Sequence, residues 1–157
     1  MLLTAENFYD MLNNFDLFRT LPEVIDSTEL TTFQRVFGNV AAGEQRNIVY
    51  VFRASNPIPR MKGESDIIYI GETKGSFKQR YLKNAPKFAT SLANRMKYEH
   101  IISHYGPIRI TIAKYDSFGE TSEQAEEQLL WWYFQNHLEL PPINYTKPKV
   151  RINEKHI

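Results

Sequence analysis

The 157-residue chain contains no cysteine. This absence excludes disulfide bonds, thiolate zinc sites and cysteine nucleophiles, so any bound metal must be held by carboxylate, imidazole or water. Long apolar runs are also missing, since no stretch approaches the ~20 residues that a membrane helix needs. The opening residues 1–6 lack the basic start and apolar core of a signal peptide. We therefore expect a protein of the cytoplasm with no membrane partner.

Length and composition favour one domain with a modest appendage and exclude two large domains. Hydrophobic residues make up 42% of the chain and aromatic residues 13%. A chain with this content can bury enough apolar surface to fold alone, which disordered and collagen-like chains cannot do. The sequence therefore predicts an ordinary globular protein.

Charge is distributed unevenly along the chain, although its net value is only +1. Residues 1–45 carry two Lys/Arg against seven Asp/Glu, residues 46–114 thirteen against four, and residues 115–157 four against seven. We call residues 46–114 the basic segment. Its cations alternate with tyrosine and phenylalanine, a mixture that suits contact with a phosphate backbone. A solvated basic surface would show the same pattern, so charge alone leaves both explanations open.

The hydrophobic pattern predicts a small antiparallel sheet. Residues 47–52 and 66–70 are β-branched and aromatic runs, typical of two paired strands, and the period-two pattern of residues 108–112 predicts a third strand. The link from Ser55 to Ser65 contains two prolines and a glycine, so we expect a projecting loop there. The fold class is therefore α/β (α+β), a small central antiparallel sheet flanked by helices.

Helices are predicted around these strands. An apolar stripe at residues 8, 11, 12 and 15 predicts a helix in an N-terminal extension, with irregular structure and one further helical turn before residue 45. Ser76 can cap a short helix that Pro86 interrupts, and a second helix follows from about Thr90. Thr121 or Ser122 can cap a long last helix, whose Leu129, Leu130, Tyr133 and Phe134 we expect inside, with Trp131-Trp132 in the core.

Five short elements occur in a fixed order within and after the basic segment. These are Ile48-Val49-Tyr50, Tyr69-Ile70-Gly71, Arg80, Glu126 and Asn144. Each is weak evidence alone, because strand tyrosines are more often core residues and charged helix residues are more often solvated. Together, and with the predicted order of strands and helices, they resemble the GIY-YIG nuclease family over residues 46–146. Residues 1–45 are then an extension and residues 147–157 a basic tail.

The resemblance implies a metal-dependent phosphodiesterase that hydrolyses DNA. Its catalytic residues would be Tyr50, Tyr69, Arg80 and Glu126. Glu126 would hold Mg²⁺ (or Mn²⁺), since a hard cation accepts one protein carboxylate together with phosphate oxygens and waters. Arg80 would bind the scissile phosphate with its planar fork. Tyr50 would activate or position the attacking water and Tyr69 would hydrogen-bond it, provided that nearby cations lower the tyrosine pKa.

Departures from the family pattern leave alternatives open. The first triplet lacks its leading glycine, and Asn84 stands where some members have histidine, which favours a tyrosine base. The spacing between Gly71 and Arg80 is one residue longer than in many members, so Lys78 or Gln79 could take the place of Arg80. Glu123 and Glu127 lie on the same predicted helix as Glu126 and remain candidate metal ligands. For DNA contacts we expect Lys74, Lys78, Lys83, Arg95 and Lys97.

The sequence thus predicts a DNA endonuclease, of restriction type if its specificity resides in this one domain. A catalytically silent nucleic-acid-binding domain and a structure-selective repair or recombination nuclease are the alternatives. Cleavage of both strands would require one active site for each strand. A homodimer is therefore a hypothesis that rests on chain size alone.

Overall fold

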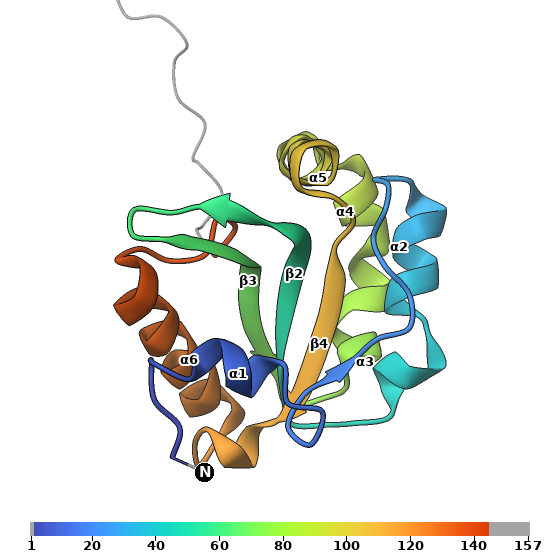
Figure 1. Cartoon of the computed structure of the whole chain (residues 1–157). Helices are drawn as coiled ribbons and strands as arrows, with labels where there is room; N and C mark the ends of the chain where they lie inside the picture. The colour runs from blue at the N-terminus through green and yellow to red at the C-terminus, as the bar shows by residue number, and fades with distance from the viewer. Residues whose placement is uncertain (1, 145–157) are drawn as a thin grey trace, which may run out of the picture.

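A four-stranded antiparallel sheet forms the centre of the computed structural model, which describes residues 2–144. The strands are β1 (Arg19–Thr20), β2 (Ile48–Pro59), β3 (Glu64–Thr73) and β4 (Arg109–Lys114), in the spatial order β1-β4-β2-β3. The fold is α+β, as predicted, with helices on both faces of the sheet (Figure 1).

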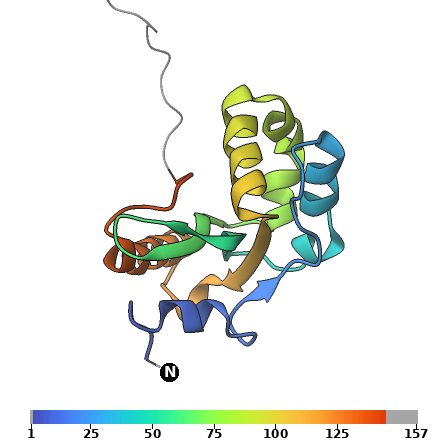
Figure 2. The ribbon, with the colours of Figure 1, turned by 45° about the horizontal axis from the view of Figure 1, so that its top comes forward.

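Six α-helices and three 3₁₀ turns surround the sheet in the described residues. The α-helices are α1 (Phe8–Leu12), α2 (Leu30–Phe37), α3 (Phe77–Tyr81), α4 (Ala85–Thr90), α5 (Leu92–Tyr105) and α6 (Ser122–His137). The 3₁₀ turns are η1 (Val40–Gly43), η2 (Leu82–Asn84) and η3 (Tyr115–Ser117). Helices α1 and α6 lie on one side of the sheet and α2 to α5 on the other, as both views show (Figures 1 and 2).

Both faces of the sheet are buried, which explains the uninterrupted apolar runs of the two long strands. On β2, Tyr50 and Phe52 enter the core beneath α2 to α5, whereas Val49 and Val51 enter the core beneath α1 and α6. Side chains alternate in this way because successive residues of a strand point to opposite faces. The two triplets therefore bring their tyrosines to the α3 side of the sheet.

The N-terminal extension belongs to this architecture. Arg19 and Thr20 pair with Ile112 and Thr111, so the extension supplies a fourth strand that the hydrophobic pattern did not predict. A strand of two exposed residues has no alternation to detect. Of the predicted first helix, residues 8, 11 and 12 are buried, but α1 ends at Leu12 and Phe15 is 89% exposed.

The predicted loop between Ser55 and Ser65 is instead a continuation of the hairpin. β2 runs to Pro59 and β3 starts at Glu64, with Pro59 opposite Glu64. A register shift between Arg53 and Ile58 separates this part from the rest of the ladder. Pairing of β2 with β4 ends at Arg53, so the prolines lie where β2 has only one neighbour and their missing N–H groups cost little.

Two further expectations about helices need correction. Pro86 does not interrupt a helix but lies in the first turn of α4, where its missing N–H has no intrahelical partner to lose. On α6, Leu129, Trp132 and Tyr133 are buried as predicted, whereas Trp131 is 55% and Phe134 38% exposed. Those two rings stack on each other at a centroid distance of 5.9 Å.

No helix among residues 2–144 is long and apolar enough to cross a membrane. The predicted basic tail at residues 147–157 lies outside the described residues.

Candidate functional site

The two triplet tyrosines lie next to each other on neighbouring strands. The rings of Tyr50 and Tyr69 stack at a centroid distance of 6.2 Å and an interplanar angle of 27°. Tyr50 is paired across the ladder with Gly71, and a Cβ at Gly71 would lie 2.5 Å from the Tyr50 ring. Glycine at the end of the second triplet therefore leaves room for the tyrosine of the first.

The Tyr50 hydroxyl is enclosed by the protein. It accepts a hydrogen bond from Tyr81 at 2.9 Å and donates a longer one, 3.4 Å, to the Glu72 carbonyl. Tyr50 is only 2% exposed, whereas Tyr69 is half-buried and lines a cavity. Tyr69 is therefore the tyrosine of the pair with the freer access to water.

Burial governs the titration of both tyrosines. Desolvation raises the pKa of Tyr50 above its usual value, and the charge of Arg80 lowers it only in part. The pKa of Tyr69 is also raised, first by desolvation and next by the negative charge of Glu126. The expectation that the basic segment lowers the tyrosine pKa is thus wrong for the free protein, because desolvation disfavours the phenolate more than Arg80 favours it.

Arg80 is held close to these tyrosines by α3. The helix begins with a capping box in which Ser76 accepts from the Gln79 N–H and Gln79 accepts from the Ser76 N–H. The Arg80 guanidinium lies over the Tyr81 ring, 5.8 Å from its centroid. Arg80 is exposed and forms no ion pair with any described residue.

The two alternatives to Arg80 have other contacts. Gln79 closes the capping box and also accepts a hydrogen bond from Arg46 at 3.2 Å. Lys78 packs near Gly43, in a separate hollow that Lys83 also lines. Arg80 is the one of these three residues whose charge acts on Tyr50 and Tyr69.

Glu126 is the carboxylate of α6 whose charge acts on the tyrosines. It is half-buried, whereas Glu123 and Glu127 are exposed, and Glu123 forms an ion pair with Lys74 at 3.7 Å. The negative charge of Glu126 acts on both Tyr69 and Tyr50. Desolvation, and then repulsion from Glu72, Glu127 and Glu123, raises the pKa of Glu126 to about 7. We call Tyr50, Tyr69, Arg80 and Glu126 the tyrosine site.

The acidic side of the tyrosine site suits a hard divalent cation. Residues 2–144 contain no group of three or more His, Asp or Glu side chains arranged to hold a metal. Glu126 has Glu72 as a repelling neighbour, and Glu72 itself accepts a hydrogen bond from Ser122 at 2.7 Å. This uncompensated negative charge would be neutralised by Mg²⁺, which accepts a single carboxylate and completes its shell with waters and phosphate oxygens. Glu72 was not predicted as part of the site, although it directly follows the second triplet.

Asn144 closes the open edge of the sheet beside the site. Its side chain accepts from the Ile70 N–H at 2.9 Å and donates to the Ile70 carbonyl at 2.8 Å. The Ile143 N–H donates to the Ile68 carbonyl at 3.0 Å. The segment after α6 thus pairs with the edge strand β3 next to Tyr69 and satisfies backbone groups that would otherwise be open. The two hydrogen bonds with Ile70 thus give a structural reason for an asparagine at position 144.

The five predicted DNA contacts differ in their surroundings. Lys97, on α5, lines a cavity with Arg80 and Tyr69, whereas Lys78 and Lys83 line the hollow near Gly43. Lys74 and Arg95 are ion-paired, with Glu123 at 3.7 Å and Glu99 at 3.3 Å respectively. The cavity of Lys97 also contains Lys87 and Asn94, which the motif comparison did not single out.

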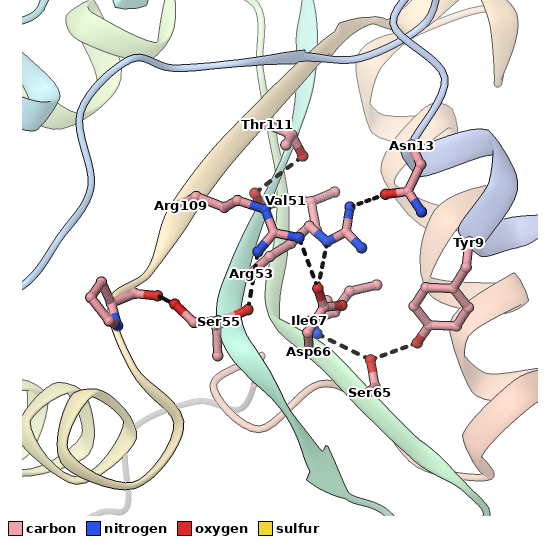
Figure 3. Close-up of polar contacts among 12 residues, drawn as sticks. Tyr9, Asn13, Val51, Arg53, Ser55, Ser65, Asp66, Ile67, Arg109 and Thr111 are labelled. Atoms are coloured by element: carbon pink, nitrogen blue, oxygen red, sulfur yellow. Dashed lines mark hydrogen bonds and ion pairs between the residues drawn. The ribbon is translucent and has the colours of Figure 1, made fainter.

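A second group of charged residues is fully paired and lies elsewhere in the sheet (Figure 3). Asp66 accepts from Arg53 at 2.9 Å and from Arg109 at 3.0 Å, and Arg53 also donates to Asn13 at 2.9 Å. We call Arg53, Asp66 and Arg109 the paired cluster. These contacts connect the C-terminal end of α1 with β2, β3 and β4, so two cations of the basic segment already have partners within the fold.

Comparison with known proteins adds nothing to this geometry. No protein-family model matches the chain, and neither a curated protein nor a solved structure matches it.

Proposed function

We propose that the protein is a metal-dependent DNA endonuclease that hydrolyses phosphodiester bonds at the tyrosine site. The observation that carries the proposal is that the charges of Arg80 and Glu126 both act on Tyr50 and Tyr69. Arg80 is exposed and has no ion pair within residues 2–144, and Glu126 is half-buried. Charges of opposite sign that act on the same hydrogen-bonding groups suit a phosphate with a bound cation. A fully paired arrangement would suit a structural role.

Each side chain has a distinct role in this proposal. Arg80 binds two oxygens of the scissile phosphate through its planar fork. Tyr69 contacts the attacking water, and the enclosed Tyr50 orients Tyr69 by ring stacking. Glu126 holds Mg²⁺, which when bound would neutralise phosphate charge, stabilise the leaving oxygen and cancel the influence by which Glu126 raises the pKa of Tyr69.

The reaction forms one bond and breaks one bond. The water oxygen, hydrogen-bonded to the Tyr69 hydroxyl, attacks phosphorus, and the bond from phosphorus to the 3′ oxygen breaks. The proton that the water loses is taken up, through solvent, by the departing 3′ oxygen. The products are a 5′-phosphate and a 3′-hydroxyl. Arg80 is suited to hold the negative charge of the phosphate as the transition state forms, and preorganised charge of this kind accounts for about 10²–10³ in rate in other enzymes.

Restriction-type, sequence-specific cleavage by a homodimer remains the finer form of the proposal. A dimer would supply one tyrosine site for each DNA strand. Sedimentation of the protein with and without DNA checks this point, and a monomer on DNA that cleaves both strands in one event would contradict it.

Plasmid cleavage tests the proposed function. Purified protein is incubated with supercoiled and linear DNA, with Mg²⁺ or with EDTA, beside Arg80→Ala and Glu126→Ala. Discrete Mg²⁺-dependent bands that both substitutions abolish support a site-specific endonuclease, and nicking or smearing supports a structure-selective or non-specific one. Salt-dependent binding without cleavage would identify a silent binding domain, and no salt-dependent binding would rule out a nucleic-acid role.

A further inference from the structure

A cavity of about 380 Å³ adjoins the tyrosine site on the side of α4 and α5. Tyr69 and Arg80 line it, so it is continuous with the position proposed for the scissile phosphate. Its far side is formed by Lys87 and Phe88 of α4 and by residues of α5. The volume falls at the lower end of the range of ~300–1,000 Å³ that is typical of sites for small ligands.

The charge of this cavity suits an anion. Arg80, Lys87 and Lys97 all line it, and none of its lining residues, which all lie within the described part of the chain, is acidic. None of these three cations is ion-paired with another residue in the range 2–144. Arg95 provides the contrast, because it lies two residues before Lys97 on α5, is ion-paired with Glu99 and does not line the cavity.

The rest of the lining suits a nucleobase. Phe88 and Tyr69 are half-buried aromatic rings with surface in the cavity, and a base can stack on such rings. Asn84 and Asn94 contribute two amide side chains. Asn84 uses its amide N–H to donate to the Arg80 carbonyl at 3.0 Å, which leaves its side-chain oxygen as an acceptor. Amides can match the donor and acceptor pattern of a base edge.

We propose that this cavity binds one unstacked deoxynucleotide, namely the one that adjoins the phosphate held by Arg80. The inference rests on the proposed function and adds the form of its substrate. A base inside a duplex cannot enter a cavity, so the nucleotide must be unpaired or be extruded from the helix, and extrusion costs free energy. DNA with an unpaired or mismatched nucleotide beside the cleaved bond is then the better substrate.

Direct binding of nucleotides tests the inference without any cleavage. The ¹⁵N-labelled full chain is titrated with deoxynucleoside 5′-monophosphates and, separately, with deoxyribose 5-phosphate, and the side-chain amide signals of Asn84 and Asn94 are followed. We expect both signals to shift with at least one nucleotide and to stay in place with deoxyribose 5-phosphate. Equal shifts with both compounds would mean a phosphate site only, and no shift with either would overturn the inference.

A matched pair of substitutions on α5 adds a control. Lys97→Ala removes a cation from the cavity and should weaken nucleotide binding about tenfold, whereas Arg95→Ala removes an equal charge outside it and should change binding less than about twofold. Equal effects would indicate general electrostatic attraction and overturn the inference. Asn94→Ala, which leaves the charge unchanged, should reduce the preference for the nucleotide over deoxyribose 5-phosphate.

Oligonucleotides separate this inference from the proposed function. A 2-aminopurine probe in a mismatch should change fluorescence on binding, and in a perfect duplex it should change less. Cleavage without nucleotide-specific shifts would overturn the proposed nucleotide binding in the cavity but support the proposed endonuclease activity. Nucleotide-specific shifts without cleavage would support nucleotide binding in the cavity and contradict the proposed endonuclease activity.

Discussion

The paired cluster and the tyrosine site use similar charged groups in opposite ways. In the paired cluster, Asp66 accepts from Arg53 and Arg109, and the Arg53 side chain is 6% exposed. In the tyrosine site, Arg80 has no ion pair within residues 2–144, and Glu126 has carboxylates as neighbours. Charged side chains that form ion pairs with each other connect parts of a fold. Charged side chains of opposite sign that form no ion pair can instead interact with a charged ligand. The comparison therefore assigns the paired cluster to stability and supports the tyrosine site as the proposed functional site.

The largest expected effect is the loss of the shared carboxylate in the paired cluster. Asp66→Ala leaves the buried Arg53 guanidinium without its carboxylate partner, which should lower the free energy of unfolding by about 3–5 kcal/mol. Urea denaturation measures this change. Asp16→Ala, at an exposed position, is the control and should stay within about 0.5 kcal/mol of the parent. A small change in the free energy of unfolding for Asp66→Ala would contradict the structural role of the paired cluster.

The pH dependence of cleavage should report the opposite behaviour at Glu126. Only the ionised carboxylate binds Mg²⁺, and the pKa of Glu126 is raised to about 7. At limiting Mg²⁺ we therefore expect the cleavage rate to fall about tenfold per pH unit below about pH 7. Higher Mg²⁺ should move this profile to lower pH, because the cation competes with the proton. A profile that does not move with Mg²⁺ would argue against Glu126 as the metal ligand.

Gly71 tests the packing that brings the tyrosines together. A Cβ at this position would lie 2.5 Å from the Tyr50 ring. Gly71→Ala should therefore displace Tyr50 and lower the free energy of unfolding by about 1–3 kcal/mol, as overpacking does in other cores. Gly43→Ala is the matched control, since its nearest neighbour would be the Lys78 side chain at 3.5 Å. Similar values for the two substitutions would show that Tyr50 can move aside freely.

The smallest expected effect is a gain of stability at Glu126. Its pKa is about 7 in the folded protein and lower in the unfolded chain, so the folded state holds more protons and stability falls as the pH rises through this window. Glu126→Gln removes the ionisable group and with it the decrease in stability at high pH. Without metal, the melting temperature of the variant should lie a few degrees above that of the parent at pH 8 and equal it at pH 4. A lower melting temperature at pH 8 would mean that Glu126 has a favourable partner.

Much of the fold could be predicted from the sequence because its signals are local. The apolar runs that include Tyr50 and Tyr69 predict strands, and Ser76 and Thr121 cap helices in the structure as their patterns indicate. The fourth strand was missed because two exposed residues have no periodicity and depend on β4 for their pairing. Likewise, the exposure of Trp131 depends on how α6 packs against the sheet, which residue type alone does not determine.

The candidate site could be predicted in its members but not in its electrostatics. The spacing of the motif predicted Tyr50, Tyr69, Arg80 and Glu126 as site residues. In the structure the two tyrosine rings stack, and the charges of Arg80 and Glu126 act on both tyrosines. The direction of the tyrosine pKa shifts depends on burial, which the sequence does not reveal. Pairing across the fold also decides which cations are free, so Lys74, paired with Glu123 on α6, differs from Lys97 in a way that their spacing cannot show.

Locating the cation tests the central claim most directly. Mn²⁺ is titrated into the ¹⁵N-labelled protein at pH 8, and the broadening of backbone amide signals is mapped for the parent and for Glu126→Gln and Glu123→Gln. The account predicts broadening that is strongest around Glu126 and Gly71, lost in Glu126→Gln and retained in Glu123→Gln. Broadening centred elsewhere, or unchanged in Glu126→Gln, would contradict a metal site at Glu126 and with it the proposed catalytic role of the tyrosine site.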